Sequence, residues 1–489
     1  MKLSLRFFIF LIAGGLTAAD RPNVLLILSD DLRPQLGCYG DDTVISPNID
    51  AFAETAVLFD RAYVQQAVCS PSRNSFLSGL RPETTGLMGF GTKLRQKVPD
   101  AVTLPQHFKN NGYWSVGMGK VYHVYAETGL GSEDDAESWS EPLFEPKNPV
   151  WGPEQEADRQ KWIAADREAG VVYNHSHDWP RGESFDDPDV PDDALRDGEI
   201  ALKAVEFLKA HAENPDQPFF LAVGFFLPHL PFVAPKKYFD LYEDVEIPIP
   251  QNQERRIGAP IYAAPFGWAG ETRYANMPPQ EQRGPEYQRA YLQAYLASIS
   301  YMDACTGLVL DALEDTGLDD NTIVMFAGDH GYMMGEYGSW GNKHCNYEMA
   351  VRAPVLVRVP GIEPGVTTGL VEFIDFYPSL AELAGLPEPK RHEGFSFASL
   401  LEDPDRNWKQ GALSIMRRGG NVGRAIRTDR YRYVCWVNRQ GKQAAEELYD
   451  YVRDPSEGRN LADLPEYAPV LKQHRKLLAG GWQGLLPAN

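Results

Sequence analysis

The chain has 489 residues, of which 43% are hydrophobic and 24% are charged. This composition supports a large buried core, as one α/β domain with an appendage or as two to three domains, and it excludes a disordered chain. The net charge of −21 argues against nucleic acid as the main partner, because the phosphate backbone is bound through clustered Lys and Arg. A local basic pocket in an acidic protein can still bind a small anionic substrate.

The N-terminus has the pattern of a secretory signal peptide. Lys2 and Arg6 precede an apolar run over residues 7–13, and small residues follow as far as Ala19. We expect a signal peptide over residues 1–19, cleaved after Ala19, and hence a secreted or periplasmic protein; a buried N-terminal strand is the alternative. No other segment has the length and apolarity of a membrane span, so no membrane span is expected.

Three continuous apolar runs, typical of buried parallel strands, are followed by acidic or imidazole side chains. The runs cover residues 23–28, 219–226 and 322–327. The side chains that follow them are Asp30 and Asp31, His229, and Asp329 and His330. Because ligands of open α/β sheets bind beyond the carboxyl ends of the strands, we expect these side chains to share one site.

The segments between these runs predict helices and loops. Helical patterns cover residues 48–55, 287–313 and 376–384. Strands that alternate with helices predict an α/β fold. Residues 130–195 and 245–285 lack periodicity, and we interpret them as long loops that select the substrate or as insertions without a role.

Short strand-like runs, such as residues 431–437, characterise the last part of the chain. They predict a small C-terminal subdomain over residues 405–489, which leaves residues 20–404 as the catalytic domain. The expected organisation is therefore a signal peptide, one large domain and one small subdomain.

Cys69 is one of five cysteines, an odd number for an exported protein. The stretch Cys69-Ser70-Pro71-Ser72-Arg73 places it at the start of a short helix with Arg73 one turn later, where exposed amides favour an anion and can activate a thiol. A small buried hydrophobic residue is the alternative for such a cysteine. None of the spacings indicates a zinc site, and the pairing of the other four cysteines stays open.

Asp30, Asp31 and Asp329 offer carboxylate oxygens, the ligands that calcium prefers. They come from two strand ends far apart in the sequence, which favours a metal site; solvated turns or helix caps are the alternative. His330 is a less natural calcium ligand because it offers nitrogen. We therefore expect a calcium site built mainly from the three aspartates.

The cysteine motif and several other blocks resemble the formylglycine-dependent sulfatases. Residues 69–73 and 77–82 are similar to the family signature C-x-P-S-R with its following L-x-G-x-x-P. Further similar blocks lie at residues 30–34, 36–40, 46–50, 117–123, 228–232, 328–331, 427–431 and 447–461. The sequence motifs D-D-L-R-P and A-V-C-x-P-S-R, with Asp-His in place of the commoner Asp-Asn, are most similar to those of the iduronate-2-sulfatase branch.

The resemblance implies an α/β, alkaline-phosphatase-like sandwich with a large mixed sheet and a smaller C-terminal α+β subdomain. It implies that a formylglycine-generating maturase oxidises Cys69 to formylglycine, whose hydrate binds one calcium ion (Ca²⁺) and attacks the sulfur. The second hydroxyl of the hydrate then eliminates sulfate, a step that a serine could not perform. The implied metal site consists of Asp30, Asp31, Cys69, Asp329 and His330, with His330 where Asn is usual.

The resemblance also assigns roles around the substrate. Arg73, Lys120 and Lys343 would supply positive charge to the sulfate group. His123 would act as the base at position 69, and His229, with Lys343, as the acid at the bridging oxygen. Solvated lysines and a hydrogen-bonded loop histidine are the alternatives. Two residues flank similar motifs and are candidates for substrate contact: Tyr332 and His344.

We therefore expect a hydrolase of sulfate esters on a sulfated carbohydrate, either a 2-O-sulfated uronic acid or an algal polysaccharide. A phosphoryl hydrolase of the same superfamily is one alternative, but it would usually need a second metal cluster, or Thr or Ser in place of Cys69. A non-catalytic protein that binds sulfated glycans is another, but Cys69, Arg73 and the three aspartates argue against it. The sequence leaves the sugar and its linkage open.

Overall fold

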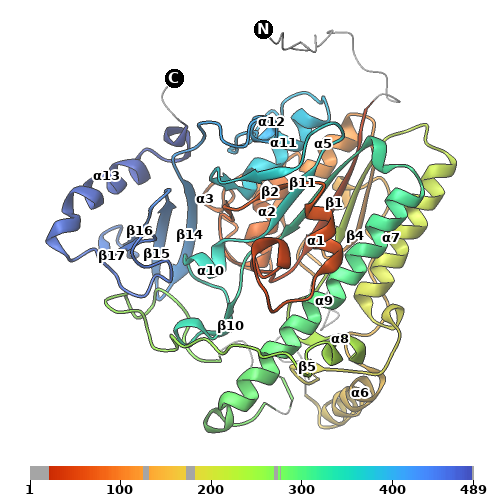
Figure 1. Cartoon of the computed structure of the whole chain (residues 1–489), viewed down its shortest axis with the longest axis horizontal. Helices are drawn as coiled ribbons and strands as arrows, with labels where there is room; N and C mark the ends of the chain where they lie inside the picture. The colour runs from red at the N-terminus through yellow and green to blue at the C-terminus, as the bar shows by residue number, and fades with distance from the viewer. Residues whose placement is uncertain (1–20, 125–131, 172–181, 269–273, 276, 487–489) are drawn as a thin grey trace, which may run out of the picture.

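The computed structural model describes residues 21–124, 132–171, 182–268, 274–275 and 277–486. The expected signal peptide lies outside the described residues, and the two expected long loops lie partly outside them. The described chain forms a large α/β unit, with a smaller antiparallel sheet and its helix on one side (Figure 1).

A seven-stranded mixed sheet forms the centre of the large unit. In order across the sheet, its strands are β12 (Gly365–Thr367), β2 (Val57–Phe59), β11 (Val355–Arg358), β8 (Thr322–Gly328), β1 (Asn23–Ser29), β6 (Phe219–Gly224) and β4 (Trp114–Gly119). β1 lies between β6 and β8 and runs parallel to both. Leu28 of β1 pairs with Gly224 and with Ala327, so the carboxyl ends of the three strands are level. The three predicted parallel strands are confirmed.

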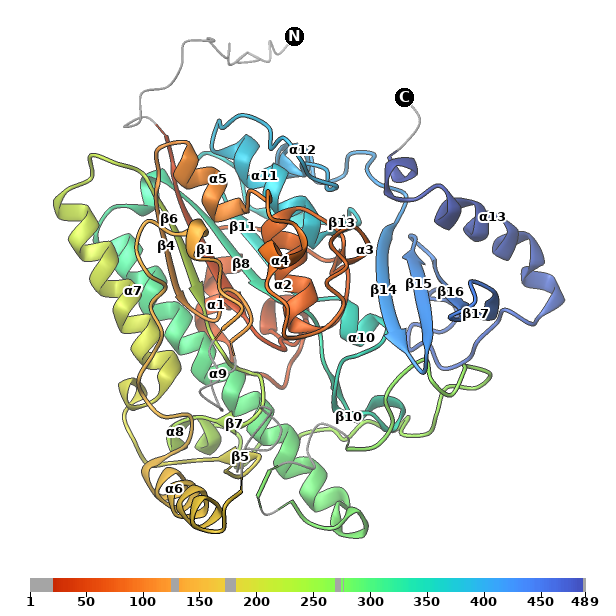
Figure 2. The same cartoon turned by 180° about the vertical axis from the view of Figure 1, so that it is seen from behind.

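Helices cover both faces of this sheet (Figures 1 and 2). Alternate residues of β1 belong to different cores, because Leu25 and Ile27 face one side and Leu26 and Leu28 face the other. The first core includes residues of α1 (Pro47–Ala53), α7 (Arg196–Glu213) and α9 (Pro285–Asp315), and the second includes residues of α2 (Cys69–Ser78), α5 (Leu104–Asn110) and α11 (Phe376–Leu383). This arrangement is the expected sandwich, and the three predicted helices are α1, α9 and α11.

The long helix α9 contradicts the expectation that no segment after the N-terminus has the length and apolarity of a membrane span. By length and composition alone, this 31-residue helix could cross a bilayer. However, 83% of its most apolar window is buried inside the protein, and residues such as Leu296 and Ile299 belong to the first core. The apolar character of α9 is that of a core helix.

The segment expected to form a loop over residues 130–195 contains a helix, α6 (Pro153–Glu168), so the expectation was wrong for these residues. Only Ile163 of α6 is buried, and the helix therefore lacks the apolar periodicity by which a sequence reveals a helix. Local interactions stabilise it instead: Pro153 begins it, and Arg159 pairs with Glu156 across one turn at 3.0 Å.

The smaller sheet is an antiparallel meander formed by the last part of the chain. Its strands are β14 (Ala412–Arg418), β15 (Asn421–Arg427), β16 (Tyr431–Val437) and β17 (Gln443–Asp450). α13 (Ala468–Ala479) packs on this sheet, with Leu471 in one core with Tyr433 and Leu448. The expected α+β subdomain is confirmed. The expected boundary between residues 404 and 405 falls between α12 (Ala398–Glu402) and β14.

A buried group of charges, which we call the interdomain cluster, joins the two sheets: Arg81, Glu372, Asp375 and Lys409. Arg81 donates from Nη1 and Nη2 to the two oxygens of Glu372, at 2.8 and 3.1 Å. Lys409 Nζ donates to Glu372 Oε2 at 2.8 Å and to Asp375 Oδ2 at 2.5 Å. The backbone N–H of Leu413 in β14 also donates to Glu372, so paired charges fix the smaller sheet to the large unit.

Short elements complete the described chain. They are β3 (Ala62–Tyr63), α3 (Pro82–Thr85), α4 (Leu94–Lys97), β5 (Phe185–Asp186), β7 (Phe232–Val233), α8 (Lys236–Asp240), β9 (Met333–Met334), β10 (Trp340–Asn342), α10 (Glu348–Val351) and β13 (Val371–Glu372). The connection from β10 to α10, residues 343–347, carries Lys343 and His344.

Candidate active site

The site lies where β1 and β8 end. The parallel register pairs Ser29 with Gly328, so the residues that follow these two are neighbours. Asp30 and Asp31 follow β1, and Asp329 and His330 follow β8. The backbone N–H of Asp31 donates to Asp329 Oδ1 at 3.0 Å. Asp31 has a φ of 63°, a left-handed conformation that Asp adopts more readily than most residues.

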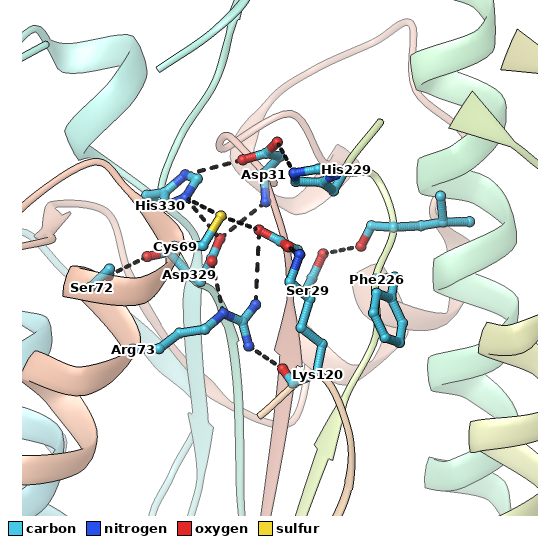
Figure 3. Close-up of polar contacts among 12 residues, drawn as sticks. Ser29, Asp31, Cys69, Ser72, Arg73, Lys120, Phe226, His229, Asp329 and His330 are labelled. Carbon is cyan, nitrogen blue, oxygen red and sulfur yellow. Dashed lines mark hydrogen bonds and ion pairs between the residues drawn. The ribbon is translucent and has the colours of Figure 1, made fainter. Parts of the chain in front are cut away.

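Cys69 is the first residue of α2, and its side chain points into the same site (Figure 3). Its Sγ lies 3.2 Å from Asp30 Oδ1, 3.3 Å from His330 Nε2 and 3.0 Å from Lys343 Nζ. Burial, followed by the negative charge of Asp30, raises the pKa of the thiol well above its ordinary value. Both effects oppose the activation of the thiol that the helix start was expected to favour.

Four donor groups in this site fit a metal ion. Atoms of Asp30, Cys69, Asp329 and His330 all lie within 4.8 Å of one another, and all four side chains are buried. Burial, followed by the negative charge of Asp30, raises the pKa of Asp329 to about 6. Burial, followed by the positive charge of Lys343, lowers the pKa of His330, so the ring is neutral and able to act as a ligand. The donor set fits a divalent cation, and its carboxylates suit calcium.

Asp31 adjoins these four donors. Its Oδ1 accepts a hydrogen bond from Lys343 Nζ and lies 3.4 Å from His330 Nδ1. Burial raises the pKa of Asp31 to about 8; Lys343 opposes this shift, whereas Asp30 and Asp329 add to it. The structure thus brings together all five predicted metal ligands, and their role in binding a metal remains a prediction.

Arg73 and Lys120 supply positive charge beside the carboxylates. Arg73 is fully buried one turn into α2; its Nε donates to Asp329 Oδ2 at 2.9 Å, and its Nη1 donates to the carbonyl oxygen of Lys120 (Figure 3). The ammonium group of Lys120, which follows β4, forms an ion pair with Asp30. Burial opposes ionisation of Asp30, but nearby positive charges, above all that of Lys120, hold its pKa well below the ordinary value.

The two predicted acid–base histidines come from different segments. His123 is 8% exposed and follows β4. His229 Nε2 lies 3.8 Å from Asp31 Oδ2, and the His229 side chain is 25% exposed, more than any predicted metal ligand. Its Nδ1 donates to the Leu230 carbonyl at 2.5 Å, because a carbonyl oxygen can only accept. Burial, followed by the positive charge of Lys120, lowers the pKa of both histidines well below the ordinary value.

The two candidates for substrate contact differ in exposure. The ring of Tyr332 is 2% exposed and stacks on that of Tyr295, with 6.0 Å between their centroids. Lys343 Nζ lies 5.9 Å from the centroid of the Tyr332 ring, and a contact of Tyr332 with the substrate stays a prediction. His344 is partly exposed and directly follows Lys343, so it lies at the edge of the site.

Three further residues hold the site in place, and sequence analysis did not identify them. Ser72 Oγ donates to a backbone carbonyl at the end of β8 at 2.6 Å. Tyr295 of α9 donates its hydroxyl to the Asp31 carbonyl at 2.8 Å. Asp197 of α7 accepts the backbone N–H groups of residues 226 and 227, which lead to the predicted acid. Ser72 lies inside the cysteine motif, whereas the other two lie on helices whose orientation toward the site cannot be read from the sequence.

The fold is of the alkaline-phosphatase-like class, and solved structures with this fold cover nearly the whole chain. The sulfatase family matches residues 22–386, and the C-terminal family of N-sulphoglucosamine sulphohydrolase matches residues 335–481. The chain belongs to the sulfatase family and is a sulfuric ester hydrolase.

Similar proteins cover nearly the whole chain. Iduronate 2-sulfatase of Mus musculus is 33% identical, and the match covers 95% of each chain. A sulfatase of Formosa agariphila is 32% identical over 94% of this chain and 86% of its own length. Among solved structures, the phosphonate monoester hydrolase of Agrobacterium radiobacter has a TM-score of 0.73 at 23% identity, covering 95% of this chain and 96% of that chain. This last similarity concerns the fold alone.

Proposed function

We propose that this sulfatase hydrolyses a sulfate ester on a sulfated carbohydrate, with formylglycine derived from Cys69 and one bound calcium ion. The observation that carries the proposal is the position of the Cys69 sulfur, which contacts a carboxylate, an imidazole and an ammonium group at 3.0–3.3 Å. The similarity to iduronate 2-sulfatase supports a 2-O-sulfated uronic acid as the substrate, and a related unit of an algal polysaccharide is the second possibility.

Asp30, Asp31, Asp329 and His330 would hold the calcium ion together with position 69. When bound, the ion supplies positive charge beside the oxygens of the sulfate group. Their burial keeps water away, which strengthens every charge interaction with the substrate. The chain itself adds the cations Arg73, Lys120 and Lys343, whose positive charges surround the same point and stabilise the charge that develops on the sulfate oxygens.

The nucleophile must come from a modified Cys69, because the unmodified thiol is buried and protonated. The hydrated aldehyde of formylglycine has one hydroxyl that can attack sulfur and a second that can lose its proton and re-form the aldehyde, which breaks the bond from carbon to the first oxygen and releases sulfate. His123 is the base for these hydroxyls: its pKa is lowered, so the neutral ring is able to accept a proton.

His229 is the acid that protonates the bridging oxygen of the leaving sugar. Its Nδ1 is occupied by the Leu230 carbonyl, which leaves Nε2 to face the substrate. A lowered pKa makes the protonated ring a strong acid, and the negative charge of a bound sulfate ester favours that protonated form. Its partial exposure places it where the leaving sugar would meet solvent.

A phosphoryl hydrolase with two metal clusters is not supported. In the described part of the chain, a single group of three or more metal-ligating side chains is found, the one around Cys69.

We also propose that the mature protein is secreted or periplasmic and that a formylglycine-generating maturase acts on it during export. The described cysteines are all unpaired.

Mass spectrometry of the peptide containing residues 69–73 tests the proposal. We expect an aldehyde or its hydrate at position 69, and sulfatase activity that rises in proportion to the converted fraction. Preparations from hosts with and without a maturase provide the range of conversion. Full activity in a preparation with an unmodified thiol contradicts the mechanism.

A further inference from the structure

The hairpin of β14 and β15 lies directly against the segment that carries Lys343. Asn346, three residues after Lys343, donates from Nδ2 to the Gly423 carbonyl at 3.0 Å. Ser414 Oγ donates to Asn346 Oδ1 at 3.2 Å. Figures 1 and 2 show this hairpin beside α10. The C-terminal subdomain thus forms part of the surroundings of the active site.

Arg418, the last residue of β14, is a partly buried cation without a carboxylate partner among the described residues. Its Nε donates to the Tyr262 carbonyl at 3.1 Å, and burial lowers its pKa. The buried arginines of the same sheet are paired with carboxylates: Arg427 with Glu348 at 3.3 Å and Arg432 with Glu457 at 2.8 Å. The chain has a net charge of −21, yet the partly buried guanidinium group of Arg418 has no carboxylate partner within the residues that the structure describes. This arrangement indicates that an anion from outside the chain pairs with Arg418.

His344 connects Arg418 to the catalytic centre. Burial, followed by the positive charges of Lys343 and Arg418, lowers the pKa of His344 to about 3. The imidazole is therefore neutral at physiological pH. Lys343, the residue before it, belongs to the catalytic centre, because its Nζ is 3.0 Å from Cys69 Sγ.

We propose that Arg418 binds a second anionic group of the saccharide, a carboxylate or another sulfate, while the reacting sulfate ester lies at position 69. This inference rests on the proposed function and deepens it by naming the substrate class: acidic sugars with a negative charge in addition to the ester. The planar guanidinium group can bind either anion through two parallel hydrogen bonds. Neutral His344 adds a hydrogen-bond partner without adding charge.

The test compares kcat/KM of the mature enzyme and of Arg418→Ala, Arg418→Lys and Arg417→Ala. The substrates are a 2-O-sulfated uronic acid saccharide, the same saccharide with its carboxyl group reduced to an alcohol, a disulfated neutral saccharide and a small aryl sulfate. Arg417 is the matched control, because it is the adjacent arginine of β14, is exposed and points to the other face of the sheet. Thermal unfolding shows whether each variant is folded.

We expect Arg418→Ala to lower kcat/KM by about 10- to 100-fold, mainly through KM, on the substrates with a second anionic group. Arg418→Lys should show a smaller loss, because lysine keeps the charge but not the paired donors. A loss confined to the uronic acid identifies the group as a carboxylate, and a loss confined to the disulfated saccharide identifies it as a sulfate.

Several outcomes overturn the inference. They are an equal loss on the aryl sulfate and the reduced saccharide, no loss on any substrate, the same loss in Arg417→Ala, or a wild type without preference for doubly anionic substrates. A mature wild type that hydrolyses none of the sulfate esters contradicts the proposed function itself, which separates the two failures.

Discussion

The catalytic cluster of Asp30, Asp31, Asp329, Arg73, Lys120 and Lys343 and the interdomain cluster both bury their charges, but they hold one carboxylate each, Asp31 and Glu372, in opposite ways. In the interdomain cluster, burial would raise the pKa of Glu372, but Arg81 and Lys409 hold it at about 2. In the catalytic cluster, burial and two neighbouring aspartates raise the pKa of Asp31 to about 8 although Lys343 is in contact.

The difference lies in the arrangement of charges rather than in their number. Both oxygens of Glu372 accept from cations, and a backbone N–H adds a further hydrogen bond. Asp31 is in contact with one cation, Lys343, and the negative charges of Asp30 and Asp329 act on it as well. A buried carboxylate that accepts from cations on both oxygens, such as Glu372, stabilises the fold, whereas a carboxylate crowded by like charges, such as Asp31, is prepared for an external cation.

The strongest test of this comparison is Asp329→Ala. We expect sulfatase activity to fall to background, because the change removes a calcium ligand and the partner of Arg73. The metal-free protein should remain folded, because the removal of one of three crowded like charges offsets the loss of the ion pair with Arg73. Activity assays and thermal unfolding of the same preparation check both parts. Residual activity near the wild-type level contradicts a role for Asp329 in the metal site.

His229→Ala tests the exposed edge of the catalytic cluster. Loss of a general acid should lower the rate by about 10²- to 10⁴-fold on a sulfated sugar, whose leaving hydroxyl has a high pKa. An activated aryl sulfate needs less protonation and should be affected far less. His474→Ala in the C-terminal subdomain, where the ring contacts Val470 and Thr428, is the control and should affect both substrates equally. Equal losses in His229→Ala would mean that another group, with Lys343 next, supplies the proton.

Glu372→Gln should have the opposite effect to Asp329→Ala. Removal of one member of a buried ion pair leaves Arg81 and Lys409 without their carboxylate, and we expect the free energy of unfolding to fall by about 3–5 kcal/mol. The specific activity of the folded fraction should be unchanged. Urea unfolding and activity below the transition measure the two effects. A stable variant with impaired turnover would place the interdomain cluster in the catalytic machinery.

The pH dependence of stability tests the lowered pKa of Glu372 in the interdomain cluster. The lowered pKa of Glu372 means that its contribution is complete above the unfolded-state value of about 4.5 and is lost as the pH falls through about 2. The unfolded chain binds more protons in this range, so stability decreases with decreasing pH, by roughly 3 kcal/mol for this group. The difference in unfolding free energy between wild type and Glu372→Gln should therefore shrink from pH 7 to pH 3. A constant difference contradicts the lowered pKa.

Calcium should stabilise the folded protein only by binding at the catalytic cluster. At a free calcium concentration about 100 times Kd, binding to the folded state adds about 2.7 kcal/mol to the free energy of unfolding. We expect this gain in wild type and in Glu372→Gln, and no gain in Asp329→Ala. Unfolding curves with calcium or with a chelator measure it. An active wild type with identical curves in both conditions rules out a calcium ion at this site.

The predictable parts of the molecule depend on short-range patterns. The buried strands β1, β6 and β8 were predicted from apolar runs, and their shared carboxyl edge placed Asp30, Asp329 and His229 in one region because parallel strands in register end together. The cysteine motif placed Cys69 and Arg73 at the same point.

Other parts depend on contacts that the sequence does not reveal. α6 was missed because only one of its residues is buried. Asp197 and Asn346 act through backbone groups of distant segments, and no local pattern marks them. The unactivated state of Cys69 depends on the distance of its sulfur from Asp30, which only the folded chain sets.

The hydrogen bonds of Asn346 to the β14–β15 hairpin have a consequence for protein engineering. A chimera that receives residues 405–489 from another sulfatase would retain Asn346 but exchange Ser414, and the segment with Lys343 would lose the hydrogen bond that the Ser414 hydroxyl donates to it. Transfer of substrate preference therefore requires the β10–α10 connection and the hairpin to be exchanged as one unit. In this fold, the segment that can be exchanged between sulfatases must include Asn346 and therefore does not end at the boundary between the domains.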